Sequence, residues 1–366
     1  MTIFITILIF IFLIGILVLA HELGHYILAK KSGIQVFEFG IGFPPKLWSF
    51  KHKGTVYSLN LIPLGGFVRM KEYAHDEGNV AESFEEKNFV QKFFVVSAGI
   101  LMNIVFAWVV FSSLFLVGFP MQLGENLSDA TIKNPHIAIN SVLPESPALK
   151  YGILAGDTIL SFNGEPVKDI STFIEMVRKN TNTPIILQLQ KGTQIREVRV
   201  IPEKLESLGE YGIGVSLVLV GKVSYEAPLA LQKGAELTFS SLYDIFRGFG
   251  MLIERVINQK PVGMEVAGPI GIALLTREVA KLGWAHLLQF AALLSLNLAV
   301  INFLPLPALD GGRALFLIIE RVRRKAMNQK VESLIHQIGF SLLLLLIVFI
   351  TFRDLARIDF LSKIFS

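Results

Sequence analysis

Long apolar runs alternate with charged stretches along this chain. Four of the runs are long enough to cross a bilayer, for which a helix needs about 20 predominantly apolar residues. They cover residues 3–20, 93–119, 283–309 and 334–352. The first run has no basic leader and no small-residue cleavage site, so we expect a retained span rather than a signal peptide. The pattern predicts a polytopic α-helical membrane protein with about four transmembrane helices.

The region between the first two runs has a strand-like pattern. Residues 56–62 combine β-branched and aromatic side chains with partial alternation, and Pro63, Gly65 and Gly66 indicate a turn before residues 67–70. Residues 72–88 are acidic and polar, which is typical of an exposed loop. We therefore expect a cytoplasmic, membrane-associated β-hairpin region with a loop over residues 31–91.

A small α/β module is predicted after the second run. The run itself is assigned to a transmembrane helix over residues 92–119. Ser146 and Ser171 are expected to begin helices, and Asn163-Gly164 is typical of a hairpin turn. Four stretches have strand patterns: 137–142, 158–162, 185–190 and 196–201. Together they predict an inserted soluble domain.

The segment that follows the module is apolar but contains charges. Residues 229–257 are interrupted by Glu236, Asp244, Arg247, Glu254 and Arg255. Such a segment is too charged to cross a bilayer and suits amphipathic helices lying at the membrane interface. We expect these interfacial helices over residues 226–282.

Composition supports a membrane protein and removes several functional classes. Hydrophobic residues make up 52% of the 366 residues and charged residues only 17%, below the roughly 25% of average soluble chains. The net charge of +4 is too small to indicate binding to nucleic acid. The chain has no Cys, which excludes thiolate zinc ligands and a cysteine nucleophile.

The basic residues predict the orientation in the membrane. Nine Lys and Arg residues lie from Lys30 to Lys92, and six more lie between the third and fourth runs. Cytoplasmic loops carry an excess of such residues, so both regions should be cytoplasmic. The N-terminus, the α/β module and the C-terminus would then be extracytoplasmic, although Arg353, Arg357 and Lys363 run against this placement of the tail.

The first apolar run is followed directly by an H-E-x-x-H motif, His21-Glu22-Leu23-Gly24-His25. We assign the run and the motif together to a first transmembrane helix over residues 1–30. On a helix the two histidines lie four residues apart on one face, so both imidazoles can bind one Zn²⁺ ion. Two histidines leave positions for a third protein ligand and for water, as catalysis requires. Glu22 would take the proton of that water and later give it to the leaving amine. The alternative is a pair of solvated residues at the membrane interface.

The third metal ligand is predicted to be Asp310. It ends a long uncharged run, which we assign to a third transmembrane segment over residues 283–314, and two prolines interrupt the helix just before it. Gly311 and Gly312 allow the backbone to bend or pack closely there. The alternative is an ordinary N-cap aspartate at the start of a cytoplasmic helix.

Several further residues are candidates for holding a substrate. Asn103, Asn297 and Asn302 could bind substrate backbone or make hydrogen bonds between helices. The strand around Leu61 and Ile62 could accept an extended substrate as an added strand. Pro305 is the remaining candidate, in the interrupted part of the third segment.

Together these motifs resemble the site-2 protease family of intramembrane metalloproteases, of the bacterial regulator-of-sigma-E protease type. The similarity covers essentially the whole chain. Its motifs are H-E-x-x-H at residues 21–25, L-D-G at 309–311, N-x-x-P-x-P at 302–307, G-x-x-x-N at 99–103, F-G-x-G-F at 39–43 and G-P-I-G at 268–271. The resemblance implies zinc bound by His21, His25 and Asp310, a catalytic Glu22, and a bacterial inner-membrane location. It also implies single-span membrane protein substrates, such as anti-sigma factors or signal-peptide remnants.

The α/β module resembles a circularly permuted bacterial PDZ domain. The similarity rests on Ser146-Pro147-Ala148, Gly156-Asp157 and Asn163-Gly164. Residues 211–215 would form its carboxylate-binding loop, which extends the domain to residues 136–220. A single such domain would filter substrates by size or by a newly exposed C-terminus.

Two rival functions follow from the same sequence. A catalytically silent membrane scaffold would use the PDZ-like module to bind partners. A transporter would use Asn297, Pro305 and Asp310 as an ion site in a broken helix. The intact metal motif disfavours the scaffold, and the absence of a visible internal repeat disfavours the transporter.

Overall fold

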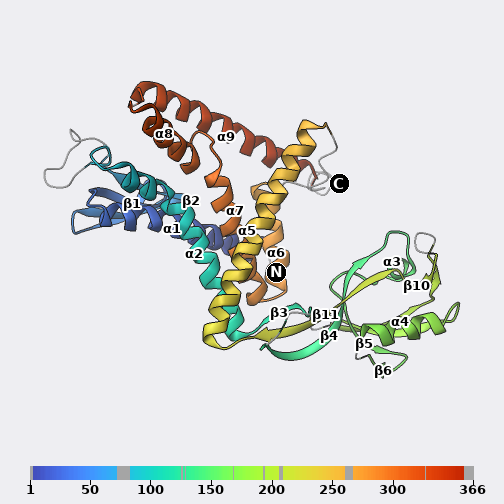
Figure 1. The fold of residues 1–366 in the computed structure, drawn as a ribbon. Coiled ribbons are helices and arrows are strands. Elements are labelled where there is room, and N and C mark those ends of the chain that lie inside the picture. The colour runs from blue at the N-terminus through green and yellow to red at the C-terminus, as the bar shows by residue number, and fades with distance from the viewer. Residues whose placement is uncertain are drawn as a thin grey trace. The chain divides into compact units, whose positions relative to one another are not determined.

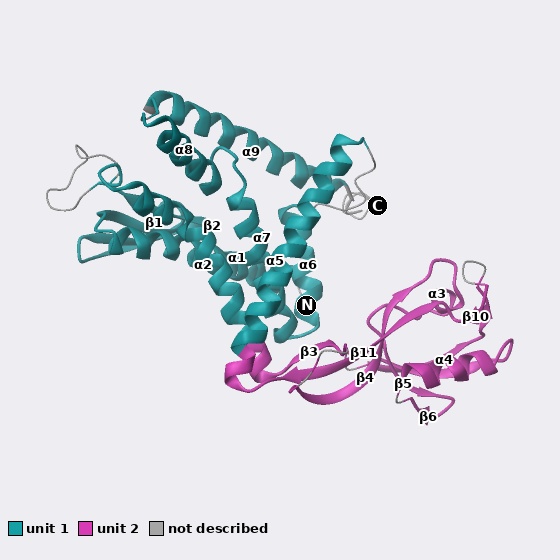
Figure 2. Cartoon of the chain, in the orientation of Figure 1, with its two compact units in different colours: residues 1–112, 231–366 teal, residues 113–230 magenta. Residues whose placement is uncertain are grey.

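The computed structural model describes residues 3–71, 83–124, 127, 129–167, 169–192, 194–205, 209–259, 267–325 and 327–357. The chain divides into two compact units (Figures 1 and 2), residues 1–112 with 231–366 and residues 113–230. Most of the predicted acidic loop at 72–88 lies outside the described residues.

Among the described residues, four helices are long and apolar enough to cross a membrane. They are α1 (Ile3–Lys31), α2 (Phe89–Val117), α7 (Trp284–Phe303) and α9 (Gln329–Arg357). Helix α1 continues past its apolar run, because no proline interrupts it, and it ends two residues before Gly33, which has a φ of 77°. Each of the four predicted spans overlaps one of these helices, and the H-E-x-x-H motif is helical.

The third apolar run is not one helix. Helix α7 ends at Phe303, residues 304–309 form a loop that contains Pro305 and Pro307, and α8 (Asp310–Arg323) follows. This break agrees with the missing backbone N–H groups of the prolines. The N-cap of α8 is Leu309, so the alternative view of Asp310 as the capping residue is wrong.

Two further helices fill the amphipathic segment. Helix α5 (Ala227–Ile257) is a single helix of 31 residues, and α6 (Pro269–Lys281) begins at a proline after Gly268. Their location at a membrane interface stays a prediction.

The strand region consists of β1 (Val36–His52) and β2 (Thr55–Met70). The chain reverses at Lys53-Gly54 and again within β2, because Val56 to Leu59 and Gly66 to Met70 run in opposite directions along the first part of β1. The turn predicted at residues 63–66 is therefore confirmed, and Gly65 there has a φ of 106°. The first part of β1 pairs with Gly66 to Met70 and is also in register with Val56 to Leu59. The two long strands therefore bend and fold back on each other.

The second unit contains a sheet with the strand order β3-β11-β4-β5-β7-β8, in which β6 pairs with β5. Its strands are β3 (Phe119–Gln122), β4 (Thr131–Val142), β5 (Thr158–Phe162), β6 (Glu165–Pro166), β7 (Ile185–Lys191), β8 (Gln194–Val200) and β11 (Val215–Ser224). A separate small pair is formed by β9 (Glu203–Lys204) and β10 (Tyr211–Gly212). Two helices complete it, α3 (Pro147–Lys150) and α4 (Ile170–Lys179).

Most of the predicted elements of this unit are confirmed, and one boundary is wrong. The Asn163-Gly164 turn joins β5 to β6, and Ser146 is the N-cap of α3. Helix α4 begins at Ile170, because the carboxylate of Asp169 rather than Ser171 accepts the N–H of Thr172. The unit has its own core, centred on fully buried Ile137, Ile185 and Leu187.

Candidate metal centre

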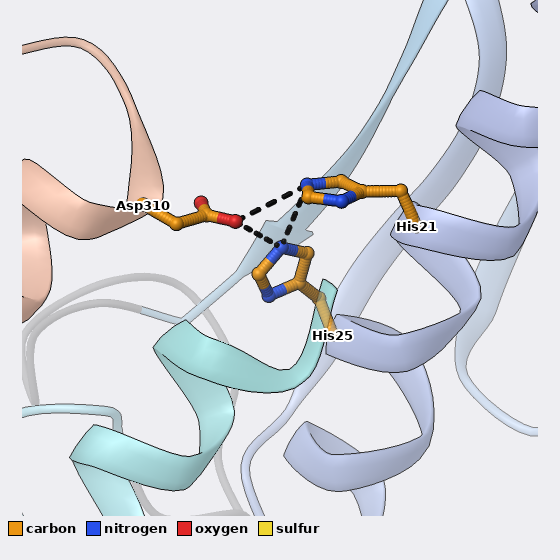
Figure 3. Close-up of side chains that lie close together, drawn as sticks. All are labelled: His21, His25 and Asp310. Carbon is orange, nitrogen blue, oxygen red and sulfur yellow. Dashed lines mark hydrogen bonds and ion pairs between the residues drawn. The ribbon is translucent and has the colours of Figure 1, made fainter. Parts of the chain in front are cut away.

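Three side chains from two distant parts of the chain meet in the first unit (Figure 3). His21 and His25 lie on successive turns of α1, and Asp310 comes from the start of α8. The Oδ2 atom of Asp310 lies 3.2 Å from Nε2 of His21 and 3.2 Å from Nε2 of His25. The two Nε2 atoms are 3.3 Å apart. The three ligand atoms thus form a nearly equilateral triangle.

This triangle has the size that a tetrahedral zinc site needs. With bonds of about 2.0–2.1 Å, two ligands of tetrahedral Zn²⁺ lie roughly 3.3 Å apart. Nδ1 of His25 lies 2.8 Å from the carbonyl oxygen of Val95, to which it can only donate. Nε2 of His25 then carries a lone pair, which faces Nε2 of His21 and Oδ2 of Asp310. Such a convergence of electron pairs is unfavourable without a cation, so the three residues fit zinc.

Helix α2 packs tightly against the two histidines. A Cβ atom at Gly99 would lie 2.5 Å from Nε2 of His25 and would also overlap the ring of His21. The amide nitrogen of Asn103 lies 3.3 Å from Nδ1 of His21. Asn103 is fully buried, and of the two roles considered for it, the structure favours a contact between helices over a contact with substrate.

Asp310 is positioned by the loop before α8 and by α9. The backbone N–H of Ala308 donates to Nδ1 of His336 on α9, at 2.9 Å. A Cβ atom at Gly339 on the same helix would lie 2.9 Å from the carbonyl oxygen of Pro307. No sequence pattern points to His336, because its partner is a backbone N–H group 28 residues away.

Glu22 lies beside the strand region. A Cβ atom at Gly66 of β2 would be 2.9 Å from Cγ of Glu22, so the strand passes this side chain at close range. Glu22 also interacts electrostatically with His25, His21 and Asp310. The carboxylate is thus placed next to the candidate metal site and next to a strand.

A cavity of about 240 Å³ lies beside the metal ligands and the strand region. His25 and Asp310 contribute to its lining, together with Val68, Arg69 and Met70 of β2. Charged side chains from α8, α9 and the segment before α2 complete one wall, namely Glu85, Arg313, Glu320 and Glu332. A polypeptide or water entering this cavity would reach the ligand triangle.

The other predicted substrate residues are not part of the triangle. Asn297 donates to the carbonyl oxygen of Leu293 in its own helix, at 2.9 Å. Asn302 is the penultimate residue of α7, and Pro305 is exposed in the loop before α8. Leu61 and Ile62 are 54% and 43% exposed. Contact of these residues with a substrate stays a prediction.

Known proteins with similar sequences are metalloproteases. A zinc metalloprotease of Clostridium perfringens is 36% identical, with 93% of this chain and 95% of that protein covered. Zinc metalloprotease RasP of Geobacillus kaustophilus is 31% identical, covering 95% of this chain and 97% of that protein. The chloroplastic membrane metalloprotease ARASP of Arabidopsis thaliana is 32% identical over 95% of this chain and 78% of its own length.

A solved structure is similar to part of the chain. The PDZ domain of the SdrC-like protein from Listeria innocua is 25% identical and covers 22% of this chain and 92% of its own, with a TM-score of 0.21.

The family model of Peptidase family M50 matches residues 9–346. This match and the full-length relatives show that the chain belongs to Peptidase family M50, the site-2 protease family, and is a membrane zinc metallopeptidase.

Proposed function

We propose that this protein cleaves peptide bonds within the transmembrane segments of other membrane proteins, with His21, His25 and Asp310 as zinc ligands and Glu22 as general base. The observation that carries the proposal is the ligand triangle, which has edges of 3.2–3.3 Å and two of its three members on the apolar helix α1. Ionisable groups within a membrane span are costly and are usually functional.

The residues divide the chemistry between them. Bound zinc supplies Lewis acidity, which polarises the scissile carbonyl and makes water a stronger acid. Glu22, which β2 can approach closely because residue 66 is a glycine, takes the proton of the attacking water and returns it to the leaving amine. His21, His25 and Asp310 fix the position at which this happens.

The test compares wild type with Glu22→Gln in purified full-length protein, using a model single-span substrate. We expect both proteins to hold zinc and the variant to cleave about 10²–10⁴ times more slowly, the usual contribution of general acid–base catalysis. Glu254→Gln, an exposed change on α5, is the matched control. Full cleavage by Glu22→Gln would place the catalytic base at another residue, and no zinc in wild type would favour the silent scaffold.

We further propose that the substrate is held in extended form along β2. A peptide bond inside a helix is shielded because its carbonyl is hydrogen-bonded four residues along. Among the described residues, Gly66 to Met70 pair only with the first part of β1, which leaves one edge of this stretch free beside the cavity. Leu61 and Ile62 would then contact apolar substrate side chains.

Proline substitution tests this template, because proline cannot donate a backbone hydrogen bond. Val68→Pro should abolish cleavage while zinc content is retained, whereas Leu61→Pro should reduce cleavage less. Wild-type cleavage by zinc-loaded Val68→Pro would exclude strand addition at this edge.

The PDZ-like module is proposed to filter substrates from the extracytoplasmic side. Its support is the distribution of Lys and Arg residues, which predicts cytoplasmic strands and an external module. Deletion of residues 136–220 should allow cleavage of substrates whose outer domain has not been trimmed. Unchanged selectivity would remove the filter from the proposal.

The absence of Cys from the chain makes the orientation simple to measure. Single Ser171→Cys and Ser49→Cys variants place an exposed thiol on α4 and on β1. A membrane-impermeant maleimide should label only Ser171→Cys from the outside. The opposite labelling pattern would invert the proposed topology.

A further inference from the structure

One face of α2 contacts both histidines. Val95, Gly99 and Asn103 are spaced by four residues and so lie on successive turns of the same face. The carbonyl of Val95 meets His25, Gly99 lies against both rings, and Asn103 meets His21. Each imidazole therefore has a partner on α2 at its Nδ1 atom.

The partner of His25 sets its tautomer. A backbone carbonyl can only accept, so Nδ1 of His25 carries the proton and Nε2 is free to bind a metal. The same outcome is required of His21, because its Nε2 atom also faces the ligand triangle. His21 therefore needs a hydrogen-bond acceptor at Nδ1.

Asn103 supplies the acceptor that lies within reach. Its Nδ2 is 3.3 Å from Nδ1 of His21, and its Oδ1 is buried with no hydrogen-bond partner. The oxygen and nitrogen of an amide are distinguished by the hydrogen bonds around them. Donation by Nδ2 would force the proton of His21 onto Nε2 and remove a metal ligand, whereas a half-turn of the amide brings Oδ1 to Nδ1.

We propose that Asn103 is the positioning residue of His21. Its Oδ1 accepts the Nδ1–H of His21 and thereby directs the Nε2 lone pair at the zinc. Helix α7 holds Asn103 in place, since Oγ of Ser295 donates to the backbone oxygen of Asn103 at 2.9 Å. Partners of this kind typically change metal affinity by about 10–100-fold when removed.

The test is zinc affinity of the full-length protein in detergent, measured by competition with a chelator. Asn103→Leu keeps the volume but removes the acceptor, and it should bind zinc about 10–100-fold more weakly. Asn103→Asp keeps an acceptor oxygen and should match or exceed wild type. Ser112→Ala, another buried polar change on α2, is the control and should bind as wild type.

A second readout is the visible absorption of the cobalt-substituted protein. The bands of Asn103→Asp should match those of wild type, and those of Asn103→Leu should shift as the ring of His21 reorients. Wild-type affinity in Asn103→Leu, or equal weakening in Asn103→Asp and Asn103→Leu, would overturn the role of Asn103.

Because the role of Asn103 rests on the proposed zinc ligands, His25→Ala is measured in parallel. Loss of zinc in His25→Ala with no change in Asn103→Leu would exclude only the positioning role. Equal zinc binding by wild type and His25→Ala would instead overturn the ligand set.

Discussion

The histidine side and the aspartate side of the metal centre are held in different ways. His21 and His25 belong to one helix and are contacted by one face of α2. In the most apolar 18-residue stretch of α2, 39% of the residues are buried inside the protein. Asp310 follows a loop whose contacts with α9 come from His336 and Gly339. In the most apolar 18-residue stretch of α9, only 6% of the residues are buried.

The three ligands therefore need not be equally rigid. Local stability follows the density of buried contacts, so the histidine pair should behave as a fixed half of the site. The loop before Asp310 instead contacts α9, whose apolar stretch is mostly exposed within the protein. Substitutions on α2 should therefore change zinc affinity directly, while substitutions on α9 should act through the position of one ligand.

The largest effect is expected from filling the space between α1 and α2. Gly99→Ala adds a Cβ that overlaps both imidazole rings, and overpacking of this kind costs about 1–3 kcal/mol. We expect zinc affinity to fall roughly tenfold or more, as measured by chelator competition. Gly15→Ala in α1 meets no atom within 4 Å and is the control. Unchanged affinity in Gly99→Ala would show that the histidine side is not rigid.

A smaller effect is expected on the aspartate side. His336→Ala leaves the N–H of Ala308 without its acceptor, a loss of about 1–3 kcal/mol for a buried group. Cleavage should slow by about tenfold with a smaller loss of zinc affinity, because both histidines still bind. Ser341→Ala, an exposed change on the same helix, is the control. An equal loss of zinc in His336→Ala and Gly99→Ala would remove the proposed asymmetry.

The smallest effect at the metal is expected from the far end of α9. Asp354 is buried and accepts the backbone N–H of Gly271 at 2.8 Å, so it caps α6 from another helix. Asp354→Ala should lower stability by about 0.5–2 kcal/mol, the usual range for a lost cap. We expect a lower thermal unfolding midpoint in detergent and unchanged zinc affinity. Weaker zinc binding would mean that α9 transmits changes along its whole length to Asp310.

Patterns in the sequence are informative where the physics is local. The apolar runs predict helices because bilayer thickness fixes their length, and the spacing of His21 and His25 places both on one helical face. Asn163-Gly164 marks a turn because it tolerates positive φ angles, which are 50° and 86° here. The turn predicted at residues 63–66 is confirmed because the chain reverses between Ile62 and Gly66, where Gly65 has a φ of 106°.

The membrane spans, the helical metal motif and the residue types that could bind zinc are readable from the sequence alone. The meeting of Asp310 with the two histidines, across almost 290 residues of chain, is visible only in the folded protein. The tertiary structure also decided that Asn103 is buried against His21 and that His336 holds the loop before Asp310. Such contacts depend on how helices pack, and packing between distant segments leaves no periodic signal in either segment alone.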